Sequence, residues 1–415
     1  MSRIEVELCV VGAGAAGLWA AAEAARLGAD VLLLEKTPRT GTKVLASGGT
    51  RCNLTTTLSP GAAARLFRGP GERFLRSAFR NLPPEKVRER FDAWGVPTVE
   101  APLEKIFPES GNAKDVRDAL EREARGAGVE IRLDASVLAV ARVAGEWHVT
   151  TADGCEVRCQ KLMLCSGGKS FPLTGTTGEG YEWLRTLGLP VTTTAPALTP
   201  LSSPATWVHE LSGIAWQDGE ARLLDSSGKT LARRRRPLLF THEGVSGPAA
   251  MDLSVHVAQA PNESFTLALD LFPELERDAL RRRMIEAAGE RGSPRVSRSL
   301  PAAIPRRFVR AITTVAGLPE DPRASELSKS TRHDLVETLK GLPIPIDGTL
   351  GFDKAEVTAG GLQLKSVNPR TMEVNGHPGL YVFGELLDLD GPIGGLNFQA
   401  AFACAQLAAE AATSA

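Results

Sequence analysis

The chain has 415 residues, 43% hydrophobic and 23% charged, as in a globular protein of roughly two or three domains. It carries 48 Lys and Arg residues against 49 Asp and Glu residues, a net charge of −1. This balance provides no overall field for a polyanion, so we expect no nucleic-acid partner and no membrane partner.

Six cysteines are scattered along the chain without framework spacing, which predicts a reducing, cytoplasmic environment. Cys155 and Cys159 have neither a His nor a second Cys pair nearby, so we expect no metal site. Residues 1–11 contain one basic and two acidic residues before a short apolar run. That pattern fits neither a signal peptide nor a membrane span.

The first elements are predicted to be a strand, a glycine turn, a helix and a second strand. Ile4, Val6 and Leu8 alternate with polar residues, as in a strand that enters a core. Residues 12–17 read Gly-Ala-Gly-Ala-Ala-Gly, apolar residues at helical spacing follow, and residues 31–34 form an apolar strand. A unit of this kind is typical of dinucleotide binding.

The glycines of this turn have separate expected roles. Gly12 permits the tight turn, Gly14 lets the backbone approach a pyrophosphate, and Gly17 allows the helix to pack closely on the strand. Glu35 ends the second strand, where a carboxylate can accept hydrogen bonds from ribose hydroxyls. The alternative is a glycine-rich turn beside a surface Glu, but the complete unit favours a bound dinucleotide.

The next part of the chain predicts two helices and a β-meander. Residues 71–95 and 112–127 have helical character, and Gly128 stops the second helix. Four short apolar runs then indicate a small meander that crosses onto the main sheet. These runs are 129–133, 137–143, 147–151 and 157–164.

A change of texture near residue 191 predicts an insertion into a discontinuous domain. Thr- and Pro-rich short strands indicate an inserted β domain over 191–272, and Arg-rich helical segments indicate a helical subdomain over 273–350. Residues 1–190 and 351–415 then form one Rossmann-like α/β domain. Within the insertion, the run Arg233–Arg236 predicts a solvated hairpin strand or a protected sheet edge. The alternative is a site for an anionic substrate or a cofactor phosphate.

The C-terminal part of the chain favours FAD over NAD. Residues 379–385 form an apolar strand ending in Gly384-Glu385, a second approach to the cofactor from the same sheet. Residues 388–397 lead into an apolar helix. The first N–H groups of that helix, around Gly395 to Asn397, would stabilise negative charge on a reduced flavin. An enzyme that binds only NAD has no such need.

These features, with several further segments, resemble a known group: the bacterial FAD-dependent oxidoreductases described as aminoacetone-oxidase-like, which include a proposed bile-acid dienone reductase. The resemblance spans nearly the whole chain in matching order, and the group typically has Gly where this chain has Thr50. The further segments that carry it are Lys43–Asn53, Ser166–Ser170, Thr174–Tyr181, Thr241–Pro248 and Val357–Gly361.

The resemblance implies a two-dinucleotide-binding flavoprotein fold: a discontinuous Rossmann-like FAD domain, an inserted β-barrel-like domain and a small helical subdomain. It also implies that the Ser47–Asn53 loop lies along the isoalloxazine. The residues agree independently, because polar side chains offer donors there, and Gly48 and Gly49 let the backbone approach a flat ring. The alternative is a capped loop with a structural Arg.

The expected cofactor contacts come from all of these segments. They are Gly12, Gly14, Ala15, Ala16, Gly17, Glu35, Lys36, Lys43, Ser47, Gly48, Gly49, Arg51, Cys52, Val137, Ser166, Gly167, Gly168, Thr358, Gly384, Glu385, Asp388, Gly394, Gly395, Leu396 and Asn397.

Four residues are candidates for catalysis: Arg51, Cys52, Asn53 and His242. Cys52 is a candidate redox group, although a packed small residue is the stronger interpretation without a second thiol nearby. His242 is the one His inside a motif, and it predicts a general acid or a substrate contact. The alternative for His242 is a hydrogen-bonded turn residue.

The expected function is that of an FAD-dependent oxidoreductase, with the flavin as hydride carrier for a small organic substrate. Only one Gly-x-Gly-x-x-Gly motif is present, so NAD(P)H is expected as a transient donor. Reduction of an activated double bond with NAD(P)H is the leading chemistry, and oxidation of a small amine by oxygen is the alternative. A non-catalytic FAD-binding scaffold is a third interpretation. A homo-oligomer stays open.

Overall fold

The computed structural model describes residues 3–414, and the chain divides into two compact units. The first unit combines Met1–Pro196 with Ala355–Ala415, and the second unit is Ala197–Lys354. The chain therefore leaves the first unit once and later returns to it. The predicted α/β fold class, with a Rossmann-type domain and additional sheets, is confirmed.

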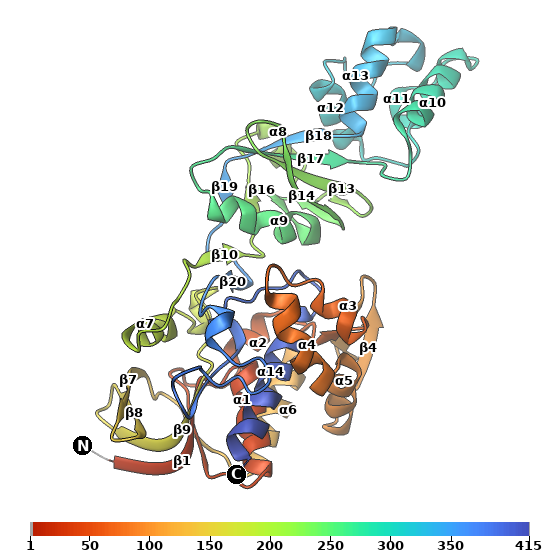
Figure 1. The fold of residues 1–415 in the computed structure, drawn as a ribbon. Helices are drawn as coiled ribbons and strands as arrows, with labels where there is room; N and C mark the ends of the chain where they lie inside the picture. The colour runs from red at the N-terminus through yellow and green to blue at the C-terminus, as the bar shows by residue number, and fades with distance from the viewer. Residues whose placement is uncertain (1–2, 415) are drawn as a thin grey trace. The chain divides into compact units, whose positions relative to one another are not determined.

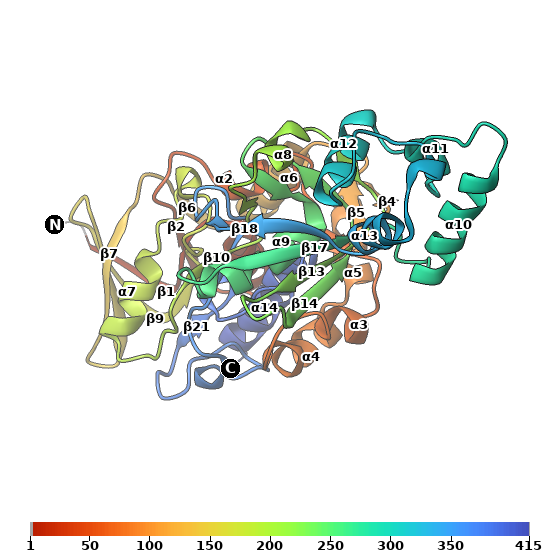
Figure 2. The same ribbon diagram turned by 90° about the horizontal axis from the view of Figure 1, so that it is seen from above.

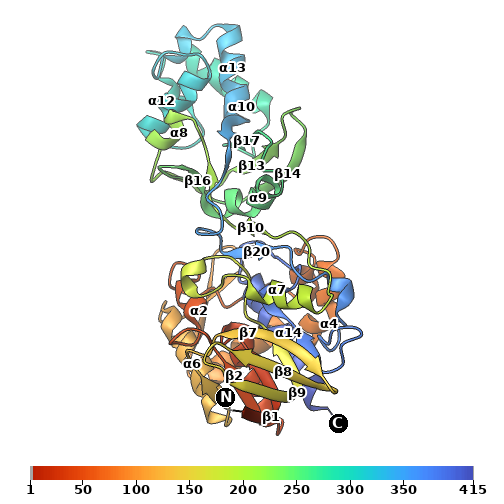
Figure 3. The same ribbon diagram turned by 90° about the vertical axis from the view of Figure 1, so that its left-hand side faces the viewer.

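A seven-stranded mixed sheet forms the centre of the first unit (Figure 3). Its parallel strands run in the order β6 (Glu130–Arg132), β2 (Val31–Leu34), β1 (Arg3–Val11) and β9 (Glu156–Leu164), with β21 (Leu380–Val382) also paired to β9. The strand β2 and the end of β1 are buried, which explains their continuous apolar sequences.

Strand β9 pairs with different partners along its length. Its first residues, Glu156–Cys159, pair with β8 (Glu146–Thr151), which pairs in turn with β7 (Val137–Val143). Its last residues, Leu162–Leu164, pair with β21. The predicted meander is confirmed for β7, β8 and β9. The prediction that residues 129–133 form its first strand is wrong. That run forms β6, which follows a crossover helix and pairs parallel to β2.

Helix α1 (Ala15–Arg26) packs against α14 (Leu396–Thr413) and α6 (Ala113–Gly126), as Figure 1 shows. Buried alanines along α1 and α14 let the two helices approach closely. At their contact, the rings of Trp19 and Phe402 lie 4.8 Å apart between centroids. This pair fixes the rotation of both helices, whose N-termini belong to the site described below.

The prediction of one helix over residues 71–95 is wrong. The structure has two helices, α4 (Gly71–Asn81) and α5 (Pro84–Ala93). Pro83 and Pro84 cause the break, because proline lacks an N–H group and disfavours helical geometry in the residue before it. Pro84 instead begins α5, where its fixed φ is tolerated.

Short elements complete the first unit, including a three-stranded sheet of order β3-β5-β4 and the pair β10-β20. No helix among residues 3–414 is long and apolar enough to span a membrane. The short elements are α2 (Thr42–Ala46), β3 (Thr55–Thr56), α3 (Pro60–Ala64), β4 (Thr98–Ala101), β5 (Lys105–Pro108), α7 (Glu179–Thr186), β10 (Ala195–Ala197) and β20 (Val357–Ala359).

The second unit contains two antiparallel sheets and a helix, α9 (Gly247–Gln259), that contacts both of them. The five-stranded sheet has the order β12 (Ala215–Trp216), β15 (Leu238–Phe240), β16 (Gly244–Ser246), β11 (Leu201–Ser202) and β19 (Gly348–Thr349). The four-stranded sheet has the order β14 (Thr230–Arg235), β13 (Glu220–Leu224), β17 (Phe265–Asp270) and β18 (Leu342–Ile346). Helix α9, which the sequence did not lead us to predict, has a proline in its first turn and contacts strands of both sheets.

Helices gather beyond the ends of β17 and β18 (Figure 2). Lys340 joins them to the four-stranded sheet: its ammonium lies 2.6 Å from Asp270 Oδ2 and donates to the Phe272 carbonyl at 2.9 Å. These helices are α10 (Arg277–Gly289), α11 (Val296–Ser299), α12 (Arg306–Val315) and α13 (Lys329–Leu339). The short α8 (Thr206–Glu210) lies between β11 and β12 in the chain.

Candidate functional site

The turn between β1 and α1 has a packed side and an open side. A Cβ atom on Gly12, whose φ is +106°, would lie 2.7 Å from the Cys165 carbonyl oxygen, and one on Gly17 would overlap the Gly12 carbonyl. Both glycines are therefore required for packing. Gly14 instead has no atom within 4 Å of its Cβ direction. Its backbone, at the start of α1, is open to a phosphate group.

Glu35 is held beside this turn at the end of β2. Its Oε2 accepts from the Ala13 N–H at 2.8 Å, and its Oε1 accepts from the Thr37 N–H at 2.9 Å. A carboxylate fixed in this way suits the ribose hydroxyls of an adenosine. The neighbouring Lys36 ammonium lies 2.5 Å from Glu179 Oε1, so its charge is compensated within the chain.

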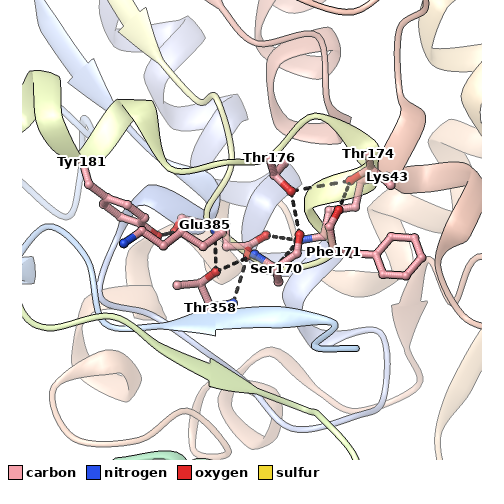
Figure 4. Close-up of polar contacts among 9 residues, drawn as sticks. Lys43, Ser170, Phe171, Thr174, Thr176, Tyr181, Thr358 and Glu385 are labelled. Atoms are coloured by element: carbon pink, nitrogen blue, oxygen red, sulfur yellow. Dashed lines mark hydrogen bonds and ion pairs between the residues drawn. The ribbon is translucent and has the colours of Figure 1, made fainter. Parts of the chain in front are cut away.

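A polar network centred on Glu385 joins segments that are far apart in the sequence (Figure 4). Glu385 Oε2 accepts from Lys43 Nζ at 2.5 Å. Glu385 Oε1 accepts from the Ser170 hydroxyl and, at 2.9 Å, from the Thr358 N–H. Lys43 also donates to Ser170 Oγ at 2.5 Å. One carboxylate therefore ties α2, the segment after β9 and β20 together.

Thr358, Gly168 and Tyr181 complete this network. Thr358 Oγ1 accepts from the Lys169 N–H at 2.8 Å, and a Cβ on Gly168 would overlap it. The Tyr181 hydroxyl donates to the Glu385 carbonyl at 2.9 Å, and burial raises the pKa of Tyr181 well above its usual value. This phenol is therefore a fixed neutral donor, and the network positions the Gly384-Glu385 segment.

The loop Ser47–Asn53 has an unusual backbone. Gly48, Gly49, Thr50 and Cys52 have φ values of +56°, +66°, +68° and +58°. This left-handed region is unfavourable for residues that carry a Cβ atom, and most of all for a β-branched residue. The resemblance leads us to expect glycine at position 50, where this chain has threonine. The positive φ at this position is a physical reason for that glycine.

The three candidate catalytic residues of this loop differ in surroundings. Cys52 is buried, and burial raises the pKa of its thiol to about 12. Asn53 Oδ1 accepts from the Ile106 N–H at 3.1 Å, and the exposed Arg51 guanidinium lies 4.5 Å from the Phe107 ring centre. The Cys52 thiol is therefore protonated at neutral pH, which favours a packing role. Catalytic roles for these residues stay predictions.

The start of α14 provides a second helix N-terminus. Gly394 and Gly395 precede the helix with φ values of +150° and +78°. Asn397 holds the loop before it, accepting from the Gly391 N–H at 2.8 Å and donating to the Gly391 carbonyl at 2.9 Å. No side chain caps α14, so its first N–H groups are open to an anionic ligand.

Other expected cofactor contacts have the following surroundings. Ser166 Oγ is buried without a hydrogen-bond partner, which is unusual unless a ligand accepts or donates there. Val137 is buried at the start of β7, and Ser47 Oγ donates to a carbonyl of α2 at 2.6 Å. Asp388 Oδ2 accepts from Thr192 Oγ1 at 3.0 Å, and burial raises the pKa of this carboxyl.

His242 belongs to the second unit, in the turn between β15 and β16, and its side chain is exposed. Its role as an acid or a substrate contact stays a prediction.

Sequence reasoning did not assign Ser170, Tyr181 and Thr192, yet each supports an assigned residue. Ser170 ends the Ser-Gly-Gly-Lys-Ser segment that carried the resemblance, so that segment could have indicated it. Tyr181 likewise ends the Thr174–Tyr181 segment of the resemblance, whereas Thr192 lies in none of these segments and its partner Asp388 is 196 positions away.

Taken together, these groups fit FAD. The open backbone at Gly14 suits the pyrophosphate, Glu35 suits the ribose, and the uncapped α14 suits the electron-rich side of the flavin. The partnerless Ser166 Oγ is a further group that a ligand would satisfy. Within residues 3–414, no three His, Cys, Asp or Glu side chains are placed to hold a metal ion.

Solved structures with a similar fold have low sequence identity to this chain. Quinol fumarate reductase FrdA of E. coli aligns with a TM-score of 0.52 at 16% identity, covering 100% of this chain and 70% of that chain. The 3-ketosteroid-delta4-(5alpha)-dehydrogenase of Rhodococcus jostii aligns with a TM-score of 0.50 at 17% identity, covering 100% and 98%. At these identities the similarity concerns the fold.

Curated relatives match over nearly the full length. The ribosomal RNA dihydrouridine synthase of Escherichia coli K12 is 31% identical, covering 96% of each chain. The 3-dehydro-bile acid delta(4,6)-reductase of Clostridium scindens is 30% identical, covering 97% of this chain and 98% of its own. A ribosomal RNA dihydrouridine synthase of Haemophilus influenzae is 31% identical, covering 96% and 97%.

The fold, the site and these relatives define an FAD-dependent oxidoreductase. The sequence profile described as HI0933-like protein Rossmann domain matches residues 6–411, and the chain belongs to that family.

Proposed function

We propose that this oxidoreductase reduces a carbon–carbon double bond conjugated to a carbonyl group, with electrons from NAD(P)H. The similarity at 30–31% identity over almost the whole chain carries the proposal, because the three relatives have names that describe reductions of ring double bonds. One is the ring of uridine, and the other belongs to a 3-dehydro bile acid.

The proposed reaction is balanced without oxygen. NAD(P)H loses a hydride and becomes NAD(P)⁺, while the double bond gains that hydride at one carbon and a solvent proton at the carbon beside the carbonyl. Bound FAD supplies the two-electron carrier between donor and acceptor.

The residues of this chain bind and orient. The α1 N-terminus at Gly14 would hold phosphate, Glu35 would hold ribose, and the α14 N-terminus would stabilise negative charge on the cofactor. Asn397 keeps the loop before α14 in place through its two hydrogen bonds to Gly391.

We further propose uridine in ribosomal RNA as the substrate. Two of the three relatives described above bear that activity in their names. This proposal departs from the expectation of a small organic substrate without a nucleic-acid partner. That expectation rested on the whole-chain charge, which conceals how the charge is distributed.

The test is an anaerobic reaction of the FAD-loaded protein with NAD(P)H and protein-free ribosomal RNA, from cells lacking this protein. Digestion and mass spectrometry of the nucleosides should reveal dihydrouridine in proportion to the NAD(P)⁺ formed. Reactions without NAD(P)H are the control. Unmodified RNA in this reaction, together with amine-dependent oxygen uptake in a separate aerobic reaction, would replace the proposal by the amine-oxidase alternative.

A further inference from the structure

The second unit contains a segment in which positive charge is not balanced. Residues 291–319 include six arginines and neither Asp nor Glu. Without those six, the chain has 42 Lys and Arg residues against 49 Asp and Glu residues, a net charge of −7. The near-neutral total therefore conceals an uneven distribution of charge, and we call residues 291–319 the arginine segment.

All six arginines of the segment are exposed. The apolar residues of α12, among them Phe308 and Val309, are buried, so that Arg306, Arg307 and Arg310 lie on the outer side of the helix. Figure 2 shows α11 and α12 within the helical end of the second unit. The arrangement is that of an amphipathic surface layer with a positive outer face.

Four of the six arginines form no ion pair with a carboxylate in the described part of the chain. Within residues 3–414, the side chains of Arg291 and Arg298 form neither a hydrogen bond nor an ion pair, and Arg295 donates to the Asp321 backbone carbonyl at 2.7 Å. Arg307 donates to the Ser212 carbonyl at 2.9 Å. The other two are loosely paired: Arg306 lies 3.5 Å from Glu320, and Arg310 lies 3.4 Å from Glu210.

Helix α6 is a charged surface helix whose charges are paired. On α6, Lys114 pairs with Asp118 at 2.9 Å, and Arg125 pairs with Glu121 at 2.8 Å. An ordinary solvated face mixes both signs in this way. The arginine segment lacks that mixture.

The cluster Arg233–Arg236 is the longest run of consecutive arginines in the sequence, and much of its positive charge is paired with carboxylates. Arg233 to Arg235 lie on β14, an edge strand of the four-stranded sheet, as the predicted role in edge protection requires, and Arg236 follows that strand. Arg234 lies 3.4 Å from Asp252, and Arg235 pairs with Asp218 and Glu274. This cluster is therefore a weaker candidate for phosphate than the arginine segment.

We propose that the arginine segment binds the phosphate backbone of the RNA substrate, an inference that rests on the proposed function. Guanidinium groups recognise phosphate through paired N–H donors, and a row of them without carboxylate partners favours a ligand whose charge repeats along its length. Binding of this kind releases counterions and is therefore sensitive to salt.

The experiment measures binding of a fluorescein-labelled, uridine-containing single-stranded RNA to the holoprotein by fluorescence anisotropy, over about 50 to 200 mM KCl. The double variant Arg291→Gln/Arg298→Gln removes the two arginines that have no partner. We expect its affinity to fall about tenfold, and the slope of log K against log salt to decrease by about 1.4.

The matched control is Arg73→Gln/Arg80→Gln, which removes two exposed arginines of α4 that also form no ion pair. It should bind the RNA like the unchanged protein. Equal affinity of the test and control variants, or no RNA binding by the unchanged protein, overturns the inference.

Flavin reduction by NAD(P)H is measured in the same proteins and should be equal in all of them. RNA binding that depends on Arg291 and Arg298, without any dihydrouridine formed, would support the binding surface and contradict only the proposed reaction.

Discussion

Glu385 illustrates how a single residue holds this site together. Its carboxylate accepts from Lys43, Ser170 and the Thr358 N–H, which come from three separate segments. The side chains of Glu385 and Lys43 are 17% and 25% exposed, so water compensates little for the loss of either charge.

Glu385→Gln tests this role. In the glutamine side chain an NH₂ group replaces one carboxylate oxygen, so one of the groups that now donate to Glu385 would face another donor. The substitution also leaves the positive charge of Lys43 without a carboxylate partner. We expect the free energy of unfolding to fall by about 2 kcal/mol, measured by urea denaturation. Glu89→Gln breaks an exposed pair with Lys86 and serves as the control, with a change below about 0.5 kcal/mol. Equal changes in both variants contradict the role given to Glu385.

Cys52 should matter for stability at high pH rather than for catalysis. Because the native pKa is about 12 against an ordinary value of 9.0, the unfolded thiol ionises first. The contribution is complete below about pH 9 and is lost as the pH rises toward 12. Cys52→Ala should therefore flatten part of the fall in stability between these values, measured by urea denaturation.

The same variant separates packing from catalysis. Cys52→Ala should reduce its flavin with NAD(P)H at a rate within about threefold of the unchanged protein, whereas loss of a catalytic acid costs about a hundredfold or more. A loss of that size would establish the catalytic assignment of Cys52.

Thr50 is a position where the sequence carries strain. With φ at +68°, replacement by glycine removes a cost of about 1–2 kcal/mol but adds unfolded-state entropy. We expect Thr50→Gly to raise the free energy of unfolding by about 0.5–1 kcal/mol. Thr57, an exposed threonine of the same region without positive φ, is the control. Thr57→Gly should lower stability, and a gain of the same size there would argue against strain at Thr50.

At the scale of elements, the β1–α1 turn separates folding from cofactor binding. Gly14→Ala introduces a side chain into open space at ordinary dihedral angles, φ −77° and ψ −171°. The Gly14→Ala protein should fold, but it should bind FAD at least about tenfold more weakly, because the methyl group blocks the approach of phosphate. Gly17→Ala should lose folded protein, because its Cβ overlaps the Gly12 carbonyl. Circular dichroism and flavin content measure the two effects, and full FAD content in Gly14→Ala would exclude this turn as the phosphate site.

Elements with local signals were the ones that sequence could predict. The helix expected over 112–127 forms as α6, capped by Asn112, and the final helix forms as α14. The two prolines at positions 83 and 84 are a local signal for the break between α4 and α5, whereas the pairing of β6 with β2 depends on a crossover that periodicity does not encode. The Glu385 network could not be predicted from local patterns. Lys43 and Ser170 precede the second unit in the sequence, whereas Thr358 and Glu385 follow it, so these residues meet only in the folded chain.

On the scale of the whole molecule, two features do not show in simple descriptions of the chain. The net charge of −1 conceals the arginine segment, and the first unit consists of two parts that are separate in the sequence, Met1–Pro196 and Ala355–Ala415. The discontinuity has a functional consequence, because β1 and α1 come from the first part whereas β21 and α14 come from the second. The FAD site that we propose would therefore require both parts of the chain, and a truncation that removes either one should abolish flavin binding.

The most direct test of the account is a visible absorption spectrum of the purified protein, recorded before and after anaerobic addition of NADH or NADPH. We predict a flavin band that bleaches with one of these donors and returns when protein-free ribosomal RNA is added. A flavin band that neither donor bleaches would contradict the NAD(P)H-linked reductase. A protein that holds no flavin even after reconstitution with FAD would contradict the cofactor assignment itself.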